Sequence, residues 1–171
     1  VCLFADDIQG VDRTHRIISG NEKEVFAAKA VPIMKSLCRK AADYGIRLVL
    51  EPLNRYSTPY CATAKDAIVI AQQVDSLGVL LDTFHMNIEE DLFKDAIQSS
   101  RKFLRHMHFA DNNRKMPGFA HIDFYTIVKS LNEIGYEGYI SFEPNVADKN
   151  YAHATKYGLD FVKRILEAQN R

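Results

Sequence analysis

Short apolar runs recur along this chain, each ending in a side chain suited to metal or proton chemistry, and this pattern constrains the fold most. The four side chains are Glu51, Asp82, His108 and Glu143, at the ends of the runs 48–50, 79–81, 103–107 and 139–142. The runs are β-branched or aromatic and helix-like stretches separate them, so the pattern predicts repeated βα units. In parallel α/β barrels the carboxyl ends of the strands face one mouth, where the chemistry lies. We therefore expect the four side chains to converge there and hold a divalent cation.

The same pattern predicts the individual elements. We expect strands at 1–5, 47–53, 79–82, 103–109 and 139–142, and helices over about 21–44, 63–74, 123–134 and 151–168. Pro32 predicts a kink or break in the first helix, and Gly45 a left-handed stop after it. Thr63 and Asp66 resemble a capping box. The acidic turn 89–91 is expected at the N-terminus of a further short helix.

Length and composition favour one cytosolic domain. The 171 residues are expected to form a single domain, 1–171, and 47% hydrophobic residues suffice for a packed core. Lys and Arg number 22, as do Asp and Glu, so no net charge attracts nucleic acid or an anionic membrane. No apolar run approaches the roughly 20 residues of a membrane span. Cys2, Cys38 and Cys61 form no CxxC pair, which is typical of a reducing, cytoplasmic location.

Alternation along the strands extends the site prediction by one layer. If Glu51, Asp82, His108 and Glu143 face inward, the residues two positions earlier also face inward, namely Val49, Leu80, His106 and Ser141. His106 would then either orient a metal-binding group through a hydrogen bond or lie in the core bonded to the backbone.

Five segments together resemble a known family. They are Glu51-Pro-Leu-Asn-Arg55, Leu81-Asp-Thr-Phe-His85, His106-Met-His-Phe-Ala-Asp-Asn-Asn-Arg114, Pro117-Gly118 and Ser141-Phe-Glu-Pro144. In this order, over roughly residues 45–170, they resemble the sugar isomerase/epimerase family with the xylose-isomerase-like TIM barrel. Within it the chain is most similar to the ketose 3-epimerases of the tagatose/psicose type, with hydroxypyruvate isomerases near by.

The resemblance implies roles for particular residues. Glu51, Asp82, His108 and Glu143 match the metal ligands, and the two glutamates match the catalytic proton-transfer pair. His85 and Arg114 match residues that contact substrate oxygens; the alternatives are a helix cap for His85 and a surface ion pair for Arg114. The chain departs from the family at Ser57, often Glu, and at Ala120, commonly Gly. These departures bear on the substrate more than on the reaction class.

The chemistry follows from the residue types. A divalent ion chelated by a small hydroxy-carbonyl sugar polarises the carbonyl and stabilises an enediolate, while one carboxylate removes a carbon-bound proton and another returns one. Three carboxylates and one imidazole favour Mn²⁺, with Mg²⁺ or Co²⁺ as alternatives. We therefore predict a metal-dependent ketose isomerase/epimerase, acting on a small sugar and expected to be a homo-oligomer.

The length of the chain constrains how this fold is present. A (β/α)₈ barrel needs about 250 residues, and five strands do not close it. We expect the chain to be the C-terminal portion of the barrel, about strands 4 to 8, lacking the first βα units. Three other functions stay open. They are a hydroxypyruvate isomerase or other aldose–ketose isomerase, an AP-endonuclease-like zinc phosphodiesterase, and an inactive fragment serving as an assembly module.

Overall fold

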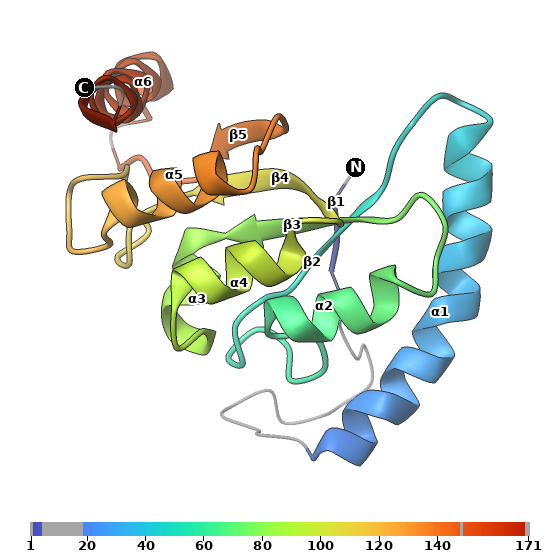
Figure 1. The fold of residues 1–171 in the computed structure, drawn as a ribbon. Coiled ribbons are helices and arrows are strands. Elements are labelled where there is room, and N and C mark those ends of the chain that lie inside the picture. Colours follow the sequence, from blue (N-terminus) through green and yellow to red (C-terminus); the bar gives the residue numbers. More distant parts are fainter. Residues whose placement is uncertain (1, 5–18, 148, 170–171) are drawn as a thin grey trace.

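Five parallel strands form one sheet whose spatial order, β1-β2-β3-β4-β5, is also their order along the chain (Figure 1). The computed structural model describes residues 2–4, 19–147 and 149–169. The strands are β1 (Cys2–Phe4), β2 (Val49–Glu51), β3 (Gly78–Asp82), β4 (Leu104–Phe109) and β5 (Tyr139–Phe142). Residues 1 and 5 of the first expected strand, and residues 6–18 of the loop after it, lie outside the described residues.

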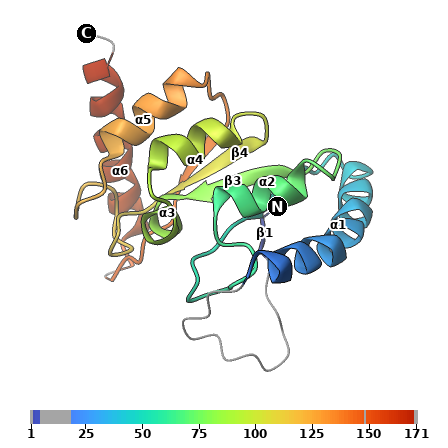
Figure 2. The ribbon, with the colours of Figure 1, turned by 60° about the horizontal axis from the view of Figure 1, so that its bottom comes forward.

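In the described residues, five helices lie between the strands, a sixth follows β5, and together they cover one face of the sheet. They are α1 (Gly20–Ala42), α2 (Ala64–Ala71), α3 (Thr83–Glu89), α4 (Phe93–Ser100), α5 (Phe124–Glu133) and α6 (Tyr151–Gln169). Contacts run from α1 to α2, α4, α5 and α6 in turn, so the helices form a row parallel to the strand order (Figure 2). This is the layering of repeated βα units, whose connections are right-handed as a rule. Among the described residues no helix is long and apolar enough to cross a membrane.

The sheet has one apolar face against the helices and one face that carries the polar residues. Leu50, Leu81, Met107 and Phe109 belong to the hydrophobic core between strands and helices. Their neighbours in sequence point the other way because side chains alternate along a strand. The register pairs Asp82 with His108, which brings the polar ends of β3 and β4 level. The alternation predicted from the sequence therefore holds across the central strands.

The helix ends follow local sequence signals. Ser19 and Glu22 form a capping box at the start of α1, and Thr63 and Asp66 form the expected one at α2. Gly45 has φ +67°, a left-handed conformation that glycine adopts without strain. The helix α1 continues across Pro32 without a break, although it bends along its length in Figure 2.

The segment after β3 differs from the prediction. Helix α3 begins directly after Asp82, whose Oδ1 accepts a hydrogen bond from the Phe84 amide at 2.7 Å and so caps it. The expected short helix is α4, which begins at Phe93 just after the acidic turn, whereas α3, which ends at Glu89, was not expected. The acidic side chains of the turn bind other segments. Glu90, for example, accepts a hydrogen bond from the amide of Ala64, the first residue of α2.

Candidate metal centre

The four side chains predicted to meet at the strand ends come together at the carboxyl edge of the sheet. Glu51 and Asp82 are the last residues of β2 and β3, His108 lies near the end of β4, and Glu143 directly follows β5. One ligand-type atom from each lies within 4.8 Å of all the others. Within the described part of the chain this is the group of His, Cys, Asp and Glu side chains that can hold a metal ion.

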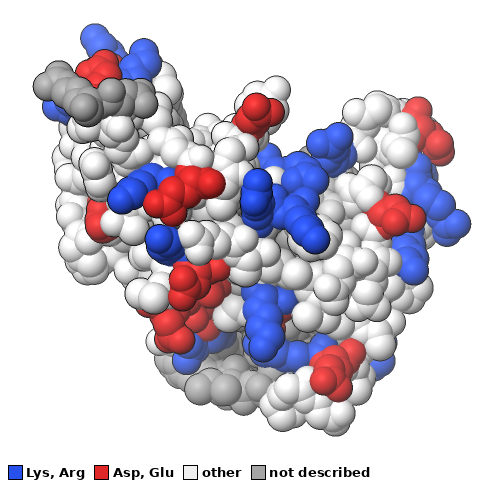
Figure 3. All heavy atoms as spheres, viewed as in Figure 1, with Lys and Arg blue, Asp and Glu red and all other residues white. Residues whose placement is uncertain are grey.

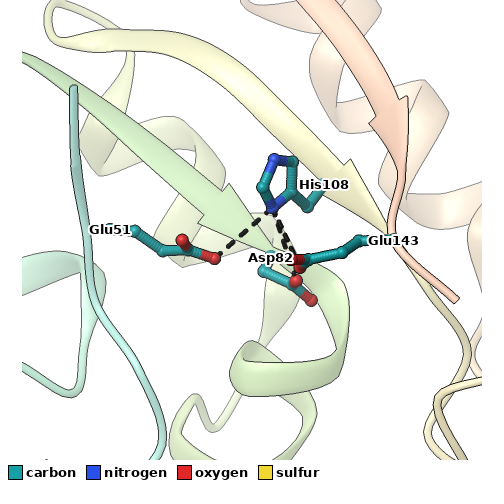
Figure 4. A group of neighbouring side chains, drawn as sticks. All are labelled: Glu51, Asp82, His108 and Glu143. Atoms are coloured by element: carbon teal, nitrogen blue, oxygen red, sulfur yellow. Dashed lines mark ion pairs between the residues drawn. The ribbon is translucent and has the colours of Figure 1, made fainter. Parts of the chain in front are cut away.

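The imidazole of His108 is the centre of this group (Figure 4). Its Nδ1 lies 3.1 Å from Glu143 Oε2, 3.5 Å from Glu51 Oε1 and 3.7 Å from Asp82 Oδ2. These contacts lack hydrogen-bond geometry, and Nδ1 is a buried polar atom with no hydrogen-bond partner. A buried nitrogen without such a partner is costly unless another group satisfies it. A cation between Nδ1 and the three carboxylates would do so.

The ionisation of the group reflects its crowding with negative charge. Burial opposes a charged imidazole, but the carboxylates of Asp82, Glu143 and Glu51 outweigh it and raise the pKa of His108 to about 11. Burial likewise opposes a charged Asp82, yet His108 and Arg114 outweigh it and lower the pKa of this carboxyl. In the absence of a metal ion, His108 is therefore protonated and Asp82 is ionised at neutral pH.

The donor set fits a hard or borderline divalent cation. Carboxylate oxygens and one imidazole nitrogen suit Mn²⁺, Mg²⁺ or Co²⁺, and the set contains no thiolate. Formal charge agrees with this choice. Replacing the His108 proton by a divalent cation brings the sum of that cation, three carboxylates and the Arg114 guanidinium to zero.

Arg114 lies at the edge of the same group. Its guanidinium donates to Asp82 Oδ2 at 2.7 Å and forms a short ion pair with Glu143 Oε2. It also lies over the ring of Phe84, 4.7 Å from the ring centre, in a cation–π contact. Arg114 itself has φ +58°, a conformation that a non-glycine residue adopts only where its surroundings enforce it. Arg114 therefore does more than form an ion pair at the surface, because its guanidinium contacts two of the four clustered residues.

Asp111 holds the loop that carries Arg114. The carboxylate of Asp111 is fully buried and accepts hydrogen bonds from four backbone amides, at 2.9–3.1 Å. The donors are the amides of Asn112, Gly118, Ala120 and Ile122. The Asp111 carbonyl also accepts from the Arg114 amide at 2.9 Å. Sequence reasoning missed this residue, although a lone Asp directly after an apolar strand was an available signal.

His85 is buried beside the group, on helix α3. Its Nδ1 accepts a hydrogen bond from the Asn54 backbone amide at 3.1 Å, and the Asn54 side-chain nitrogen lies 2.8 Å from the same atom. Burial lowers the pKa of His85. The helix cap after β3 is Asp82, so the alternative role of His85 as a cap is wrong. The sequence interpretation gave Asn54 no role in the site.

The layer beneath the group contains a second polar contact. His106 Nε2 lies 2.8 Å from Ser141 Oγ, joining β4 to β5. The His106 and His108 rings meet edge to face, with centres 5.2 Å apart. His106 therefore bonds a side chain of the inner layer rather than the backbone. Of the two departures from the family pattern, Ser57 is exposed on the loop after β2, and the Ala120 amide bonds Asp111.

A separate hollow lies at the other end of the sheet. It measures about 650 Å³ and is lined by the amino ends of β2, β4 and β5, including Arg47, Arg105 and Tyr139. None of the four clustered residues lines it. Lys and Arg side chains gather near the middle of the face shown in Figure 3, with acidic side chains around them. Glu137 is the one carboxylate among the described residues that line the hollow, so the hollow lacks the converging carboxylates that the chemistry requires.

Comparison with known proteins supplies the family. The model of the xylose isomerase-like TIM barrel matches residues 10–165. The 3-dehydro-D-guloside 4-epimerase of Escherichia coli is 33% identical over 150 residues, covering 86% of this chain and 55% of that protein. The D-psicose 3-epimerase of Agrobacterium fabrum is 37% identical over 121 residues, covering 70% of this chain and 42% of that protein.

A solved structure agrees. The apo form of 3-keto-D-glucoside 4-epimerase from E. coli superposes with a TM-score of 0.81 at 28% identity, over 95% of this chain and 63% of that one. The chain spans about half the length of the curated relatives it matches. The matched family model and these sugar-epimerase relatives show that the chain belongs to the xylose isomerase-like TIM barrel family.

Proposed function

We propose that the protein carrying this chain is a divalent-metal-dependent epimerase of a ketose or related keto-sugar. In it Glu51 and Glu143 transfer the proton by way of an enediolate. The observation that carries the proposal is the convergence of three carboxylates on His108 Nδ1, a buried nitrogen without a hydrogen-bond partner. Glu51, Asp82, His108 and Glu143 would hold the ion. Bound there, a divalent cation supplies Lewis-acid polarisation of a substrate carbonyl.

The positions of the two glutamates support proton transfer on opposite faces of a carbon. Glu51 ends β2 and Glu143 follows β5, with the two intervening strands between them. A sugar bound between these carboxylates would expose one face to each. One carboxylate removes the proton and the other returns a proton to the opposite face, which inverts the carbon. A site with a single base returns the proton to the same face.

The names of the relatives indicate one kind of substrate, a sugar whose reacting carbon lies next to a carbonyl. Psicose has its carbonyl at C2 and is epimerised at C3, whereas a 3-dehydro sugar has its carbonyl at C3 and is epimerised at C4. In both cases the reacting carbon is next to a carbonyl, so its proton is acidic enough for a carboxylate base. We assign a free ketose as the first candidate substrate. A 3-keto-glycoside is the second candidate. The two E. coli relatives named for 3-dehydro or 3-keto sugars match a larger share of this chain than the psicose 3-epimerase of Agrobacterium fabrum does.

His85 and Arg114 are proposed to bind substrate oxygens. Both are cationic or hydrogen-bonding side chains beside the carboxylates, and Arg114 bonds two of them. The Arg114 guanidinium would also balance negative charge that develops on a substrate oxygen.

Strands upstream of the described sheet are proposed to complete the barrel. β1 and β5 are the edges of the five-stranded sheet, and the curated relatives are about twice as long as the chain. We propose that the chain is the C-terminal portion of such a barrel and that the first βα units pair with both edges. A preference for Mn²⁺, a cytoplasmic location and homo-oligomeric assembly stay predictions.

The test uses the protein with all the βα units of the barrel, called the barrel-complete protein below. It is supplied with a panel of substrates and with added Mn²⁺, Mg²⁺ or Co²⁺. Psicose, tagatose, a 3-keto-glucoside and hydroxypyruvate are incubated in D₂O, and deuterium incorporation is located by NMR. Exchange at C3 of a ketose supports the first candidate, and exchange at C4 of the 3-keto-glucoside supports the second. Exchange at C1 alone, or turnover of hydroxypyruvate, favours an aldose–ketose type of isomerase. No exchange with any metal contradicts the proposal.

A further inference from the structure

The loop after β2 and the helix after β3 are tied together beside the metal centre. Arg55 donates from its backbone amide, at 2.6 Å, and from its guanidinium, at 2.9 Å, to both carboxylate oxygens of Glu89. Such a forked pair fixes orientation as well as distance. Glu89 ends α3, the helix that carries His85. Asn54, next to Arg55, is therefore held in a defined position against His85.

The hydrogen bonds between Asn54 and His85 define which ring nitrogen carries the proton. The Asn54 backbone N–H can only donate, and it points at His85 Nδ1 from 3.1 Å. An imidazole nitrogen that accepts a hydrogen bond has no proton of its own. A neutral His85 must then carry its proton on Nε2.

The Asn54 side chain reinforces the same tautomer. Its Oδ1 accepts a hydrogen bond from the Tyr56 amide at 3.0 Å, which places the NH₂ group, rather than the oxygen, 2.8 Å from His85 Nδ1. Two donors of Asn54 therefore face one ring nitrogen. Both side-chain hydrogen bonds of His85 within the described part of the chain involve this atom.

Burial keeps the His85 ring neutral. Asn54 is 4% exposed and His85 7% exposed, so the contact is shielded from water. Desolvation is the largest influence and lowers the pKa of His85; the carboxylates of Asp82, Glu51 and Glu143 act in the opposite direction, and the Arg114 charge adds to the lowering. Protonation of Nδ1 would also place an N–H against two N–H donors. The ring is thus held with one proton, on the nitrogen opposite Asn54.

We propose that Asn54 is a positioning residue that fixes His85 in the Nε2–H tautomer, so that His85 acts as a neutral hydrogen-bond donor to a substrate oxygen. This inference rests on the proposed function for the identity of the acceptor, a sugar oxygen. A neutral donor stabilises negative charge on that oxygen without serving as a base. Proton removal is then left to the two glutamates, which also keeps His85 from competing for the proton.

The experiment reads the tautomer directly, by ¹⁵N NMR of the histidine side chains in the Mg²⁺-loaded, barrel-complete protein without substrate. The His85 signals are identified by their loss in His85→Gln. The wild-type protein should show protonated Nε2 and unprotonated Nδ1 between pH 6 and 8. A wild-type ring protonated on Nδ1, or on both nitrogens at pH 7, overturns the inference.

Two substitutions of Asn54 separate positioning from simple packing. Asn54→Asp places a negatively charged acceptor beside Nδ1, which should outweigh the remaining backbone donor and put the proton on that atom, lowering kcat/KM by about 10²-fold, the loss typical of a misplaced donor. Asn54→Ala keeps the backbone donor, so it should keep the wild-type tautomer and lose less activity. An Asn54→Asp protein with unchanged tautomer and kcat/KM overturns the inference. Because the tautomer is read without turnover, absence of epimerase activity in the wild-type protein counts against the proposed function alone.

Discussion

The two glutamates of the site face the same imidazole from very different surroundings. Glu51 ends β2, a strand with neighbours on both sides, and 8% of its side chain is exposed. Glu143 follows β5, an edge strand, and 49% of its side chain is exposed. Tyr139, at the start of β5, is 79% exposed. The Glu51 half of the site is thus enclosed by the described sheet, whereas the Glu143 half is open.

This difference indicates what holds each half in place. Glu51 depends on a strand that is paired on both sides. Glu51 itself pairs with Phe4 of β1, and its neighbour Leu50 pairs with Val79 of β3. Glu143 depends on the loop 111–122, because Arg114 binds its carboxylate and the Arg114 carbonyl accepts a hydrogen bond from the Asn145 amide at 2.6 Å. The open half is therefore arranged by polar contacts of one loop. We expect it to gain packing when upstream strands cover β5.

Substituting each glutamate compares the two halves most directly. Glu51→Gln and Glu143→Gln keep the shape and one oxygen but remove the base, so each should lower turnover in the barrel-complete protein by at least about 10²-fold. Glu137→Gln, at an exposed position by the far hollow, is the matched control and should leave turnover unchanged. The measurement is solvent deuterium exchange into the substrate. Undiminished exchange in both variants would refute the two-glutamate mechanism.

Removing the Asp111 carboxylate should disturb the open half alone. Asp111→Ala leaves four backbone amides without their buried acceptor, which should cost at least about 3 kcal/mol in the free energy of unfolding. Asp123→Ala is the control, because it removes only the exposed cap of α5 and should cost about 1 kcal/mol. Urea unfolding measures both. Equal losses in the two variants would show that Asp111 does not organise the loop.

The comparison also explains which parts were predictable from sequence. Alternation and strand ends depend on local periodicity, so the inward positions of Glu51, Asp82 and His108 and the parallel order of the strands could be predicted. The contact between Asn54 and His85 joins residues 31 positions apart through loop conformation, and periodicity carries no such information. The same holds for Asp111, whose four donors come from an irregular loop. The metal-binding and catalytic roles themselves stay predictions.

Arg114 tests whether the open half binds substrate or only supports the metal. Arg114→Ala should raise KM or lower kcat/KM by about tenfold while the metal content stays unchanged, because a charged hydrogen bond to substrate is lost but the four ligands remain. Arg101→Ala, in the hollow at the other end of the sheet, is the control. Kinetics and metal analysis are measured together. Loss of bound metal in Arg114→Ala would assign Arg114 a structural role.

The smallest effect concerns the proton that His108 carries between the two halves. Its pKa is raised to about 11 because three carboxylates outweigh its burial, so metal-free protein is protonated there at pH 8. This stabilisation is fully present below the unfolded value of about 6.5 and is lost as pH rises through about 11.

A ligating imidazole must be neutral, so binding of the metal has to displace that proton. Asp82 contributes no second proton because its pKa is lowered, and His85 contributes none because burial keeps it neutral. Titration of metal-free protein with Mg²⁺ or Mn²⁺ in buffers of different ionisation enthalpy should therefore release about one proton per ion. Affinity should rise by about tenfold per pH unit between pH 7 and 9. His108→Gln should abolish the release, and release that persists in this variant would place the displaced proton elsewhere in the site.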